Sequence, residues 1–211
     1  MSSKMKVAVF VSGGGTNLQK LIEEKQRGGL PYCSFELVVA SNSKAYALER
    51  AKAAGINAVT VAKKDYSDIN SYNKAILKVL EQHGIEIIVT AGYLSILGKE
   101  IISKYENKII NIHPSLIPGF CGMGYYGLKV HEQVLEQGVK VTGATVHFVN
   151  EGVDTGAIIL QRAVKVLDND TPITLQKRVM KQAEWVILPM ALDLLTQDKL
   201  VFKNKRVVIR K

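Results

Sequence analysis

Two polar side chains stand two residues apart in the run Asn111-Ile112-His113-Pro114-Ser115. Alternation along a strand places Asn111 and His113 on the same side of the chain. Pro114 ends the strand, so His113 is expected to project past the edge of the sheet. An amide and an imidazole that converge there can donate hydrogen bonds to a developing oxyanion and relay a proton. A histidine before a proline is also common as a structural residue, so the residues alone leave both roles open.

The run Ser12-Gly13-Gly14-Gly15-Thr16-Asn17 lies between a strand-like series of valines and a helical pattern. Backbone N–H groups at such a helix N-terminus can bind a phosphate. The run has no lysine, which a P-loop needs, and Leu18 stands where the dinucleotide fingerprint needs a third glycine. After the second expected strand, Ser41-Asn42-Ser43 replaces the acid that would hold a ribose. These features favour a phosphate that is not part of a dinucleotide; a plain tight turn is the alternative.

Asp154 lies in the run Glu151-Gly152-Val153-Asp154-Thr155-Gly156, where an aspartate beside glycine is most often a turn residue. A carboxylate close to His113 would instead hold the imidazole cationic and orient a water molecule. The sequence does not establish that the two residues are close. Of the other histidines, His147 alternates within a strand and is interpreted as structural, whereas His131 opens a helix and could face the pocket.

The histidines and cysteines lack the spacing of zinc ligands, so no metal is expected. The sequence contains no Gly-x-Ser-x-Gly elbow and no credible cysteine nucleophile, which argues against covalent acyl transfer.

The elements that position these residues are read from hydrophobic periodicity. Strands are expected at 6–12, 35–40, 58–61, 86–91 and 108–111, with helices at 17–27, 45–54, 67–83 and 99–104. Valine- and isoleucine-rich strands separated by helices predict a doubly wound, mostly parallel α/β sheet, a Rossmann-like variant whose ligands lie beyond the carboxyl ends of the strands.

The second half of the chain has a different pattern. A loop at 114–127 and a helix at 128–137 precede an antiparallel hairpin of strands 139–148 and 157–166. A long helix follows at 174–196, with a kink or break near Ile187 or Leu188 because Pro189 interrupts it. Segments 200–202 and 206–209 predict a small terminal hairpin. We expect one domain over 1–211, with a phosphate-binding half at 1–111 and a catalytic half at 112–211.

The composition limits the classes of partner. The formal net charge of +9 is spread along 211 residues with little aromatic interleaving, and no nucleic-acid recognition motif accompanies it. We therefore expect anionic small-molecule substrates, with no nucleic acid. No apolar stretch is long enough for a membrane span. Two cysteines and the absence of a secretory signal indicate a cytoplasmic protein. A monomer or weak dimer is expected.

Four segments carry a resemblance to a known family. They are residues 11–18, 91–97, 111–118 and 145–156, which contain Val-Ser-Gly-Gly-Gly-Thr-Asn-Leu, Ala-Gly-Tyr-Leu-Ser-Ile-Leu, Asn-Ile-His-Pro-Ser-Leu-Ile-Pro, and Thr-Val-His-Phe-Val with Asp-Thr-Gly. In this order, and over nearly the whole chain, they resemble the phosphoribosylglycinamide formyltransferases. The resemblance implies transfer of a formyl group from 10-formyltetrahydrofolate to the amine of glycinamide ribonucleotide in purine biosynthesis. It implies direct attack by the amine through a tetrahedral intermediate.

The resemblance also implies roles for individual residues. Those matching the loop that binds the ribose phosphate are Gly15, Thr16 and Asn17. Those matching segments that contact the folate are Leu94, Ser95, Ile96, Leu97, Val141, Thr142, Gly143 and Ala144. Those matching the catalytic trio are Asn111, His113 and Asp154, and Glu184 matches a glutamate near the glycinamide substrate. Many members carry arginine at the position of Ser95 and another near Ile69, so the resemblance leaves the contacts to the folate glutamate tail open, with Lys63 or Lys64 as the alternative cation. The loop at 120–127 is longer than in the common form.

Three alternative functions remain open at this stage. A formyltetrahydrofolate hydrolase would use water in place of the amine, but usually carries an additional N-terminal domain. A methionyl-tRNA formyltransferase would need a C-terminal tRNA-binding domain. From a different class, a basic nucleotide- or RNA-binding module would show RNA affinity with a steep salt dependence and no folate binding.

Overall fold

The computed structural model describes residues 4–204 and 206–210. The chain divides into two compact units, the first ending at Ile110 and the second beginning at Asn111. Among the described residues the main sheet has seven strands in the order β3-β2-β1-β4-β5-β6-β7, and a second sheet pairs β8 with β9. The expectation of a single domain stays a prediction.

The first unit is built on parallel strands. They are β1 (Met5–Val11), β2 (Cys33–Ala40), β3 (Asn57–Thr60) and β4 (Ile87–Thr90). Strand β1 pairs in parallel with both β2 and β4, and β2 pairs in parallel with β3. The last five residues of β1, from Val7 to Val11, are completely buried. A strand without an exposed face belongs to a sheet covered on both sides, which explains its unbroken apolar sequence.

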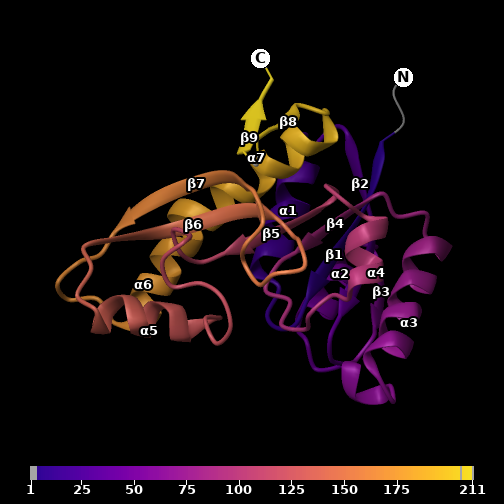
Figure 1. Ribbon diagram of the computed structural model, residues 1–211, viewed down its shortest axis with the longest axis horizontal. Helices are drawn as coiled ribbons and strands as arrows, with labels where there is room; N and C mark the ends of the chain where they lie inside the picture. Colours follow the sequence, from indigo (N-terminus) through magenta and orange to yellow (C-terminus); the bar gives the residue numbers. More distant parts are fainter. Residues whose placement is uncertain (1–3, 205, 211) are drawn as a thin grey trace. The chain divides into compact units, whose positions relative to one another are not determined.

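Helices connect these strands. They are α1 (Thr16–Gln26), α2 (Ala47–Ala53), the short 3-10 helix η1 (Lys63–Asp65), α3 (Ile69–Gln82) and α4 (Lys99–Lys104). Helix α3 begins where Asp68 caps it: the carboxylate accepts from the N–H of Ser71 at 2.8 Å. Helices α3 and α4 lie side by side (Figure 1).

The second unit has an antiparallel sheet and a long helical segment. Its elements are the end of β5 (Ile109–His113), α5 (Leu128–Glu136), β6 (Val141–Phe148), β7 (Ile158–Lys165), α6 (Pro172–Val179), the π-helix η2 (Met180–Glu184), α7 (Trp185–Thr196), β8 (Leu200–Lys203) and β9 (Arg206–Ile209). Strands β6 and β7 pair antiparallel, as do β8 and β9, which confirms both expected hairpins. The predicted fold class, a mostly parallel sheet with an antiparallel C-terminal portion, is confirmed.

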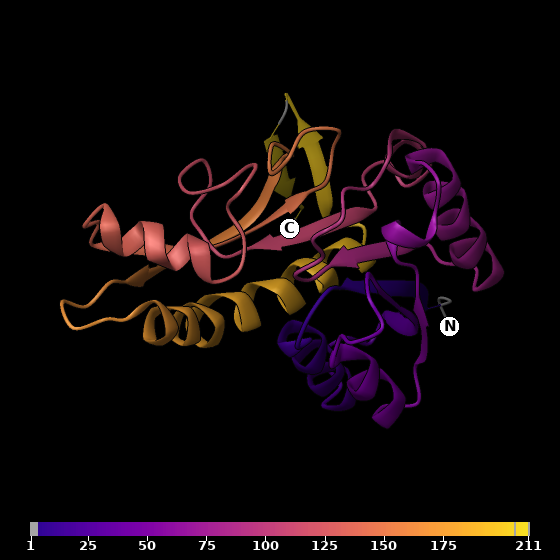
Figure 2. The same ribbon diagram turned by 90° about the horizontal axis from the view of Figure 1, so that it is seen from below.

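The long helical segment differs from its prediction. It begins at Pro172, two residues before the expected start, because the hydroxyl of Thr171 caps it by accepting from the N–H of Thr174 at 3.2 Å. It continues through Pro189 without a break at Ile187 or Leu188. The irregular turn is instead the π-helix at 180–184. A proline ring crowds the carbonyl four residues earlier, here that of Trp185, which lies where the π-helix meets α7. Figure 2 shows α6, η2 and α7 following one another as a long rod.

Among the described residues, no helix is both long enough and apolar enough to cross a membrane.

Candidate active site

The glycine loop of the first unit joins β1 to α1 in an unusual backbone conformation. Gly15 precedes the first helical residue with φ at +68°, and no side chain caps this helix end. A Cβ on Gly15 would lie 2.5 Å from the Cβ of Ala47, so α2 packs directly on the loop. Residues with a side chain rarely adopt this φ, and the close packing independently requires glycine. The helix N-terminus therefore presents backbone N–H groups without a side-chain competitor.

The segment expected to contact the folate lies against this loop. The hydroxyl of Ser12 accepts from the N–H of Leu94 at 2.9 Å, and the N–H of Ser12 donates to the carbonyl of Gly92 at 3.1 Å. Leu94 and Ile96 are 60% and 56% exposed, whereas Leu97 is buried. The first unit thus brings together the predicted phosphate loop and a predicted folate segment, which presents two apolar side chains to solvent.

His113, at the end of β5, has a polar neighbour close to each ring nitrogen. Its Nδ1 lies 3.5 Å from Oδ2 of Asp154, and its Nε2 lies 2.9 Å from the carbonyl oxygen of Phe120. A carbonyl only accepts, so Nε2 carries the proton and Nδ1 faces the carboxylate. The ring is buried, with 4% exposure for the residue. The structure therefore places the imidazole beside an acid that lies 41 positions later in the sequence.

Asp154 reaches this position through a strained turn between β6 and β7. Its φ is +56°, in the left-handed region that aspartate tolerates better than most residues. Its Oδ2 also accepts from the N–H of Gly122 at 2.9 Å. Gly156 completes the turn, since a Cβ there would lie 1.7 Å from the carbonyl oxygen of Phe148. The carboxylate therefore ties the turn after β6 to the loop after β5.

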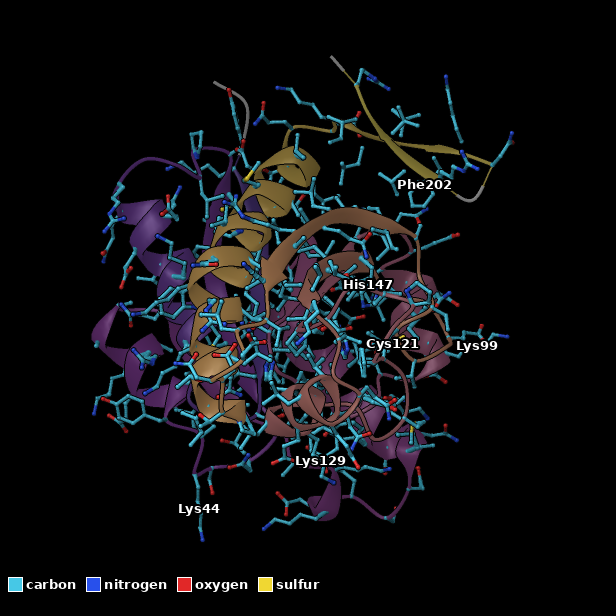
Figure 3. The ribbon with its side chains drawn as sticks, turned by 90° about the vertical axis from the view of Figure 1, so that its left-hand side faces the viewer. Lys44, Lys99, Cys121, Lys129, His147 and Phe202 are labelled. Atoms are coloured by element: carbon cyan, nitrogen blue, oxygen red, sulfur yellow. The ribbon has the colours of Figure 1, made fainter. Side chains whose placement is uncertain are left out.

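His147, which the strand pattern alone predicts to be a structural residue, joins this group. Its Nε2 lies 3.1 Å from Nδ2 of Asn111 and 3.5 Å from Oδ1 of Asp154. Its Nδ1 lies 2.8 Å from the carbonyl of Phe148 and must donate to it. In the neutral ring Nε2 is then an acceptor, so the amide group of Asn111 donates to it. His147 thus orients the amide of Asn111. Figure 3 labels His147 and also Cys121, which lies in the loop after β5.

The ionisation of this cluster differs from the expected pattern in one respect. Burial lowers the pKa of His113 and outweighs the opposite effects of the Asp154 charge and the Phe120 carbonyl. Asp154 thus acts on the pKa of His113 in the expected direction, but the effect of burial is larger. Burial acts to raise the pKa of Asp154, but its contacts with His147 and His113 and the hydrogen bond from the Gly122 N–H leave it below its ordinary value. The resting pair is a carboxylate beside a neutral imidazole.

A network of hydrogen bonds holds the loop that follows His113. The hydroxyl of Thr145 donates to the carbonyl of Ser115 at 2.7 Å and accepts from the N–H of Ile117 at 3.1 Å. The side-chain amide of Gln161 donates to the carbonyl of Ile117 at 2.9 Å. Strands β6 and β7 therefore fix the start of the loop whose Phe120 and Gly122 contact the catalytic candidates.

The other expected folate segment lies at the start of β6. Val141 is exposed, whereas Thr142, Gly143 and Ala144 are buried. A Cβ on Gly143 would lie 2.8 Å from Cδ2 of Leu116, so this position packs against the same loop. Thr142 lies on the opposite side of the strand, and its hydroxyl has no hydrogen-bond partner among the described residues.

Two further polar residues are buried in the second unit. Glu184 lies in the π-helix with 6% exposure. His131 is completely buried on α5, and neither ring nitrogen has a hydrogen-bond partner in the part of the chain that the structure describes. Burial, with the charge of His113, lowers the pKa of His131 to about 4. His131 is therefore neutral near pH 7. Within 4–204 and 206–210, no three histidine, cysteine or acidic side chains form a group able to hold a metal ion.

Comparison with known proteins identifies the family. The sequence pattern of the formyl transferase family matches residues 5–192. The chain is 44% identical over 193 residues to the trifunctional purine biosynthetic protein adenosine-3 of Gallus gallus, covering 92% of this chain and 18% of that protein. It is 41% identical over 181 residues to the chloroplastic phosphoribosylglycinamide formyltransferase of Arabidopsis thaliana, covering 85% of this chain and 61% of that protein. The chain therefore spans less than two thirds of either relative.

A solved structure gives fuller coverage. The glycinamide ribonucleotide transformylase 1 of Symbiobacterium toebii superimposes with a TM-score of 0.93 at 36% identity, covering 100% of this chain and 96% of that one. The match extends over the glycine loop, β5 and the hairpin that carries Asp154. The chain therefore belongs to the formyl transferase family, among the phosphoribosylglycinamide formyltransferases.

Proposed function

We propose that this protein transfers the formyl group of 10-formyltetrahydrofolate to the amine of glycinamide ribonucleotide. The observation that carries the proposal is the His113 imidazole held between the Asp154 carboxylate and the Phe120 carbonyl, with its Nδ1 3.5 Å from Oδ2 of Asp154. An acid–base pair beside an amide donor suits formyl transfer between two amines, because that reaction needs oxyanion stabilisation and proton transfer but no covalent enzyme intermediate.

The acceptor is assigned from the first unit. Gly15, Thr16 and Asn17 begin α1 and offer backbone N–H groups to a phosphate. Glycinamide ribonucleotide carries such a phosphate on its ribose, at the far end from its amine. Glu184 is proposed to lie near the glycinamide portion. A formal net charge of +9 adds a general attraction for an anionic substrate.

The donor is assigned to two segments. Leu94 and Ile96 are exposed apolar side chains suited to contact a flat pteridine or the benzoyl group next to it. Val141, Thr142, Gly143 and Ala144 are proposed as the second folate segment. Ser95 and Ile69 supply no cation for the folate glutamate tail, so we expect a weaker contribution of that tail to binding.

The reaction begins when the amine nitrogen attacks the formyl carbon. A C–N bond forms, and the electrons of the C=O bond move to the oxygen, which becomes an oxyanion. The side-chain amide of Asn111, which His147 orients, is the donor proposed for the oxyanion. A donor of this kind contributes about 3–4 kcal/mol to the transition state.

His113 is neutral at rest because burial lowers its pKa. A developing oxyanion beside the ring has the opposite effect, since a negative charge favours the imidazolium. The imidazole therefore takes up the proton that the attacking nitrogen loses, Asp154 stabilises the cation at its Nδ1, and the ring gives this proton up again when the intermediate collapses. In this order of events the ion pair between the His113 imidazolium and the Asp154 carboxylate is absent before the reaction and forms only in the transition state.

Collapse of the intermediate breaks the bond from the formyl carbon to N10 of the folate. The attacking nitrogen must lose a proton, and N10 must gain one. We assign this transfer to a water molecule held by the Asp154 carboxylate, whose lowered pKa keeps it ionised near neutral pH. The products are N-formylglycinamide ribonucleotide and tetrahydrofolate.

An absorbance assay of tetrahydrofolate formation tests the proposal. The purified protein is mixed with 10-formyltetrahydrofolate with and without glycinamide ribonucleotide. We expect tetrahydrofolate only when the acceptor is present, together with an equal amount of formylated product. Equal rates without the acceptor would identify a hydrolase. Tight RNA binding that weakens steeply with salt, with no turnover in either mixture, would identify a binding module.

A further inference from the structure

The carbonyl groups of the glycine loop are all engaged by protein donors. The Ser12 carbonyl accepts from Nδ2 of Asn42 at 2.9 Å, and the Gly13 carbonyl accepts from the N–H of Ala47 at 3.1 Å. The Gly14 carbonyl accepts from Nε of Arg50 at 2.8 Å. The last carbonyl, of Gly15, accepts from the N–H of Gln19 in α1 at 2.9 Å. Each peptide of the loop therefore has a fixed orientation.

Because each peptide bond is planar, the direction of a carbonyl group also determines the direction of the N–H group of the next residue. In a trans peptide the C=O of one residue and the N–H of the next point in opposite directions. A Gly14 carbonyl held by Arg50 therefore turns the Gly15 N–H away from α2. The Gly13 carbonyl does the same for the Gly14 N–H. Among the described residues, no protein acceptor is paired with the N–H groups of residues 13–16.

Arg50 is the charged residue among the donors to the loop carbonyls, and its side chain contacts more than one element. Besides the Gly14 carbonyl, its guanidinium donates from Nη1 to Oε1 of Gln19 at 3.0 Å. The guanidinium carbon also lies 5.1 Å from the centre of the Tyr46 ring, which restricts its rotation. Arg50 thus links α2, the glycine loop and the first turns of α1. A bond from a cation to a carbonyl also polarises that peptide and makes its N–H a stronger donor.

We propose that Arg50 is a positioning residue for phosphate binding: it holds the Gly14 peptide so that the loop N–H groups are aimed at the phosphate of the acceptor, without itself touching that phosphate. This inference rests on the proposed function. Lysine cannot replace it, since an ammonium lacks the planar fork that reaches the Gly14 carbonyl and Gln19 together.

The test compares Arg50→Met, Arg50→Lys and wild type with two acceptors, glycinamide ribonucleotide and its riboside without the phosphate. We expect both variants to raise KM for the ribonucleotide about tenfold, with kcat and the KM for the folate nearly unchanged. The kcat/KM for the riboside should be the same in all three proteins, because it does not use the loop. Lys52→Met, which removes an exposed positive charge from the same helix, is the matched control and should behave as wild type.

Three outcomes would overturn the inference. One is an unchanged ribonucleotide KM in Arg50→Met. Another is an equal loss with the riboside, which would indicate a general structural role. The third is a wild-type KM in Arg50→Lys, which would indicate a charge acting at a distance. If Arg50→Met does not fold, Gln19→Leu removes the second contact of the guanidinium, and a ribonucleotide-specific rise in KM is again expected. Absence of turnover in wild type would instead contradict the proposed function itself.

Discussion

The Nε2 atom of His147 lies 3.1 Å from Nδ2 of Asn111. Because the other ring nitrogen of His147 donates to the Phe148 carbonyl, this contact fixes which way the Asn111 amide points. An oxyanion donor is effective only when it is oriented before the reaction begins. His147 is thus an orienting partner of a catalytic candidate.

Replacement of His147 by phenylalanine tests this contact. The ring shape is kept, but the acceptor for Asn111 and the donor to Phe148 are lost. We expect kcat to fall about tenfold or more, with smaller changes in KM. Steady-state kinetics of His147→Phe and His83→Phe provide the comparison, since His83 lies at the end of α3 and its Nδ1 bonds the Val79 carbonyl at 2.8 Å. Similar losses in both variants would argue against a specific role for His147.

Replacement of Asp154 by asparagine tests the acid–base pair. The amide keeps the size of the side chain but can neither stabilise an imidazolium nor accept a proton. We expect kcat to fall by about 10²–10⁴, while dissociation constants for both substrates change little. Asp168→Asn is the control, because that carboxylate is 93% exposed and forms an ion pair with Lys140 on the surface. Turnover like that of wild type in Asp154→Asn would exclude the assigned role.

Stability is expected to fall in mild acid because of His131. The unfolded chain protonates this histidine near its ordinary pKa of 6.5, whereas burial lowers the folded pKa to about 4. Between these values the unfolded state binds more protons, so unfolding becomes more favourable as pH decreases. The loss from pH 7 to pH 5 should be about 2 kcal/mol for this group. Above the pKa of the unfolded chain, the contribution of neutral His131 to the free energy of unfolding is fully present.

Urea unfolding of wild type and His131→Leu at several pH values measures this effect. The variant should lose less stability between pH 7 and pH 5. A smaller dependence should remain, because burial also lowers the pKa of His113. An identical pH dependence in both proteins would show that His131 is not the titrating group.

Gly15 and Gly55 allow backbone strain to be separated from steric contact. Both have positive φ, +68° and +70°, but a Cβ on Gly55 meets open space, whereas one on Gly15 meets Ala47. Gly55→Ala should cost about 1–2 kcal/mol in the free energy of unfolding, and Gly15→Ala should cost more. Gly15→Ala should also weaken phosphate binding. Chemical denaturation and competition by inorganic phosphate measure the two effects, and equal costs would rule out the contact with α2.

Much of this site follows from local sequence. The glycine loop was predicted because a run of glycines between a strand and a helix has few other uses, and the strand end at His113 followed from Pro114. The parallel strands, the β6–β7 hairpin and the terminal β8–β9 hairpin likewise follow from residue periodicity. The break predicted near Pro189 is wrong. The position of the irregular turn depends on where the helix can widen, which here is at Met180–Glu184.

What the sequence determined by itself is the set of chemical groups and the elements that carry them: an amide and an imidazole at one strand end, a phosphate loop, and a turn with an aspartate. What only the tertiary structure decided is which groups meet. In the sequence, a loop and a helix separate His113 from His147 and Asp154. The three side chains come together only because β5 and β6 are neighbours in the sheet. Burial, which lowers the pKa of His113 despite the nearby carboxylate, is likewise a property of the packed fold, because desolvation depends on every element around the ring.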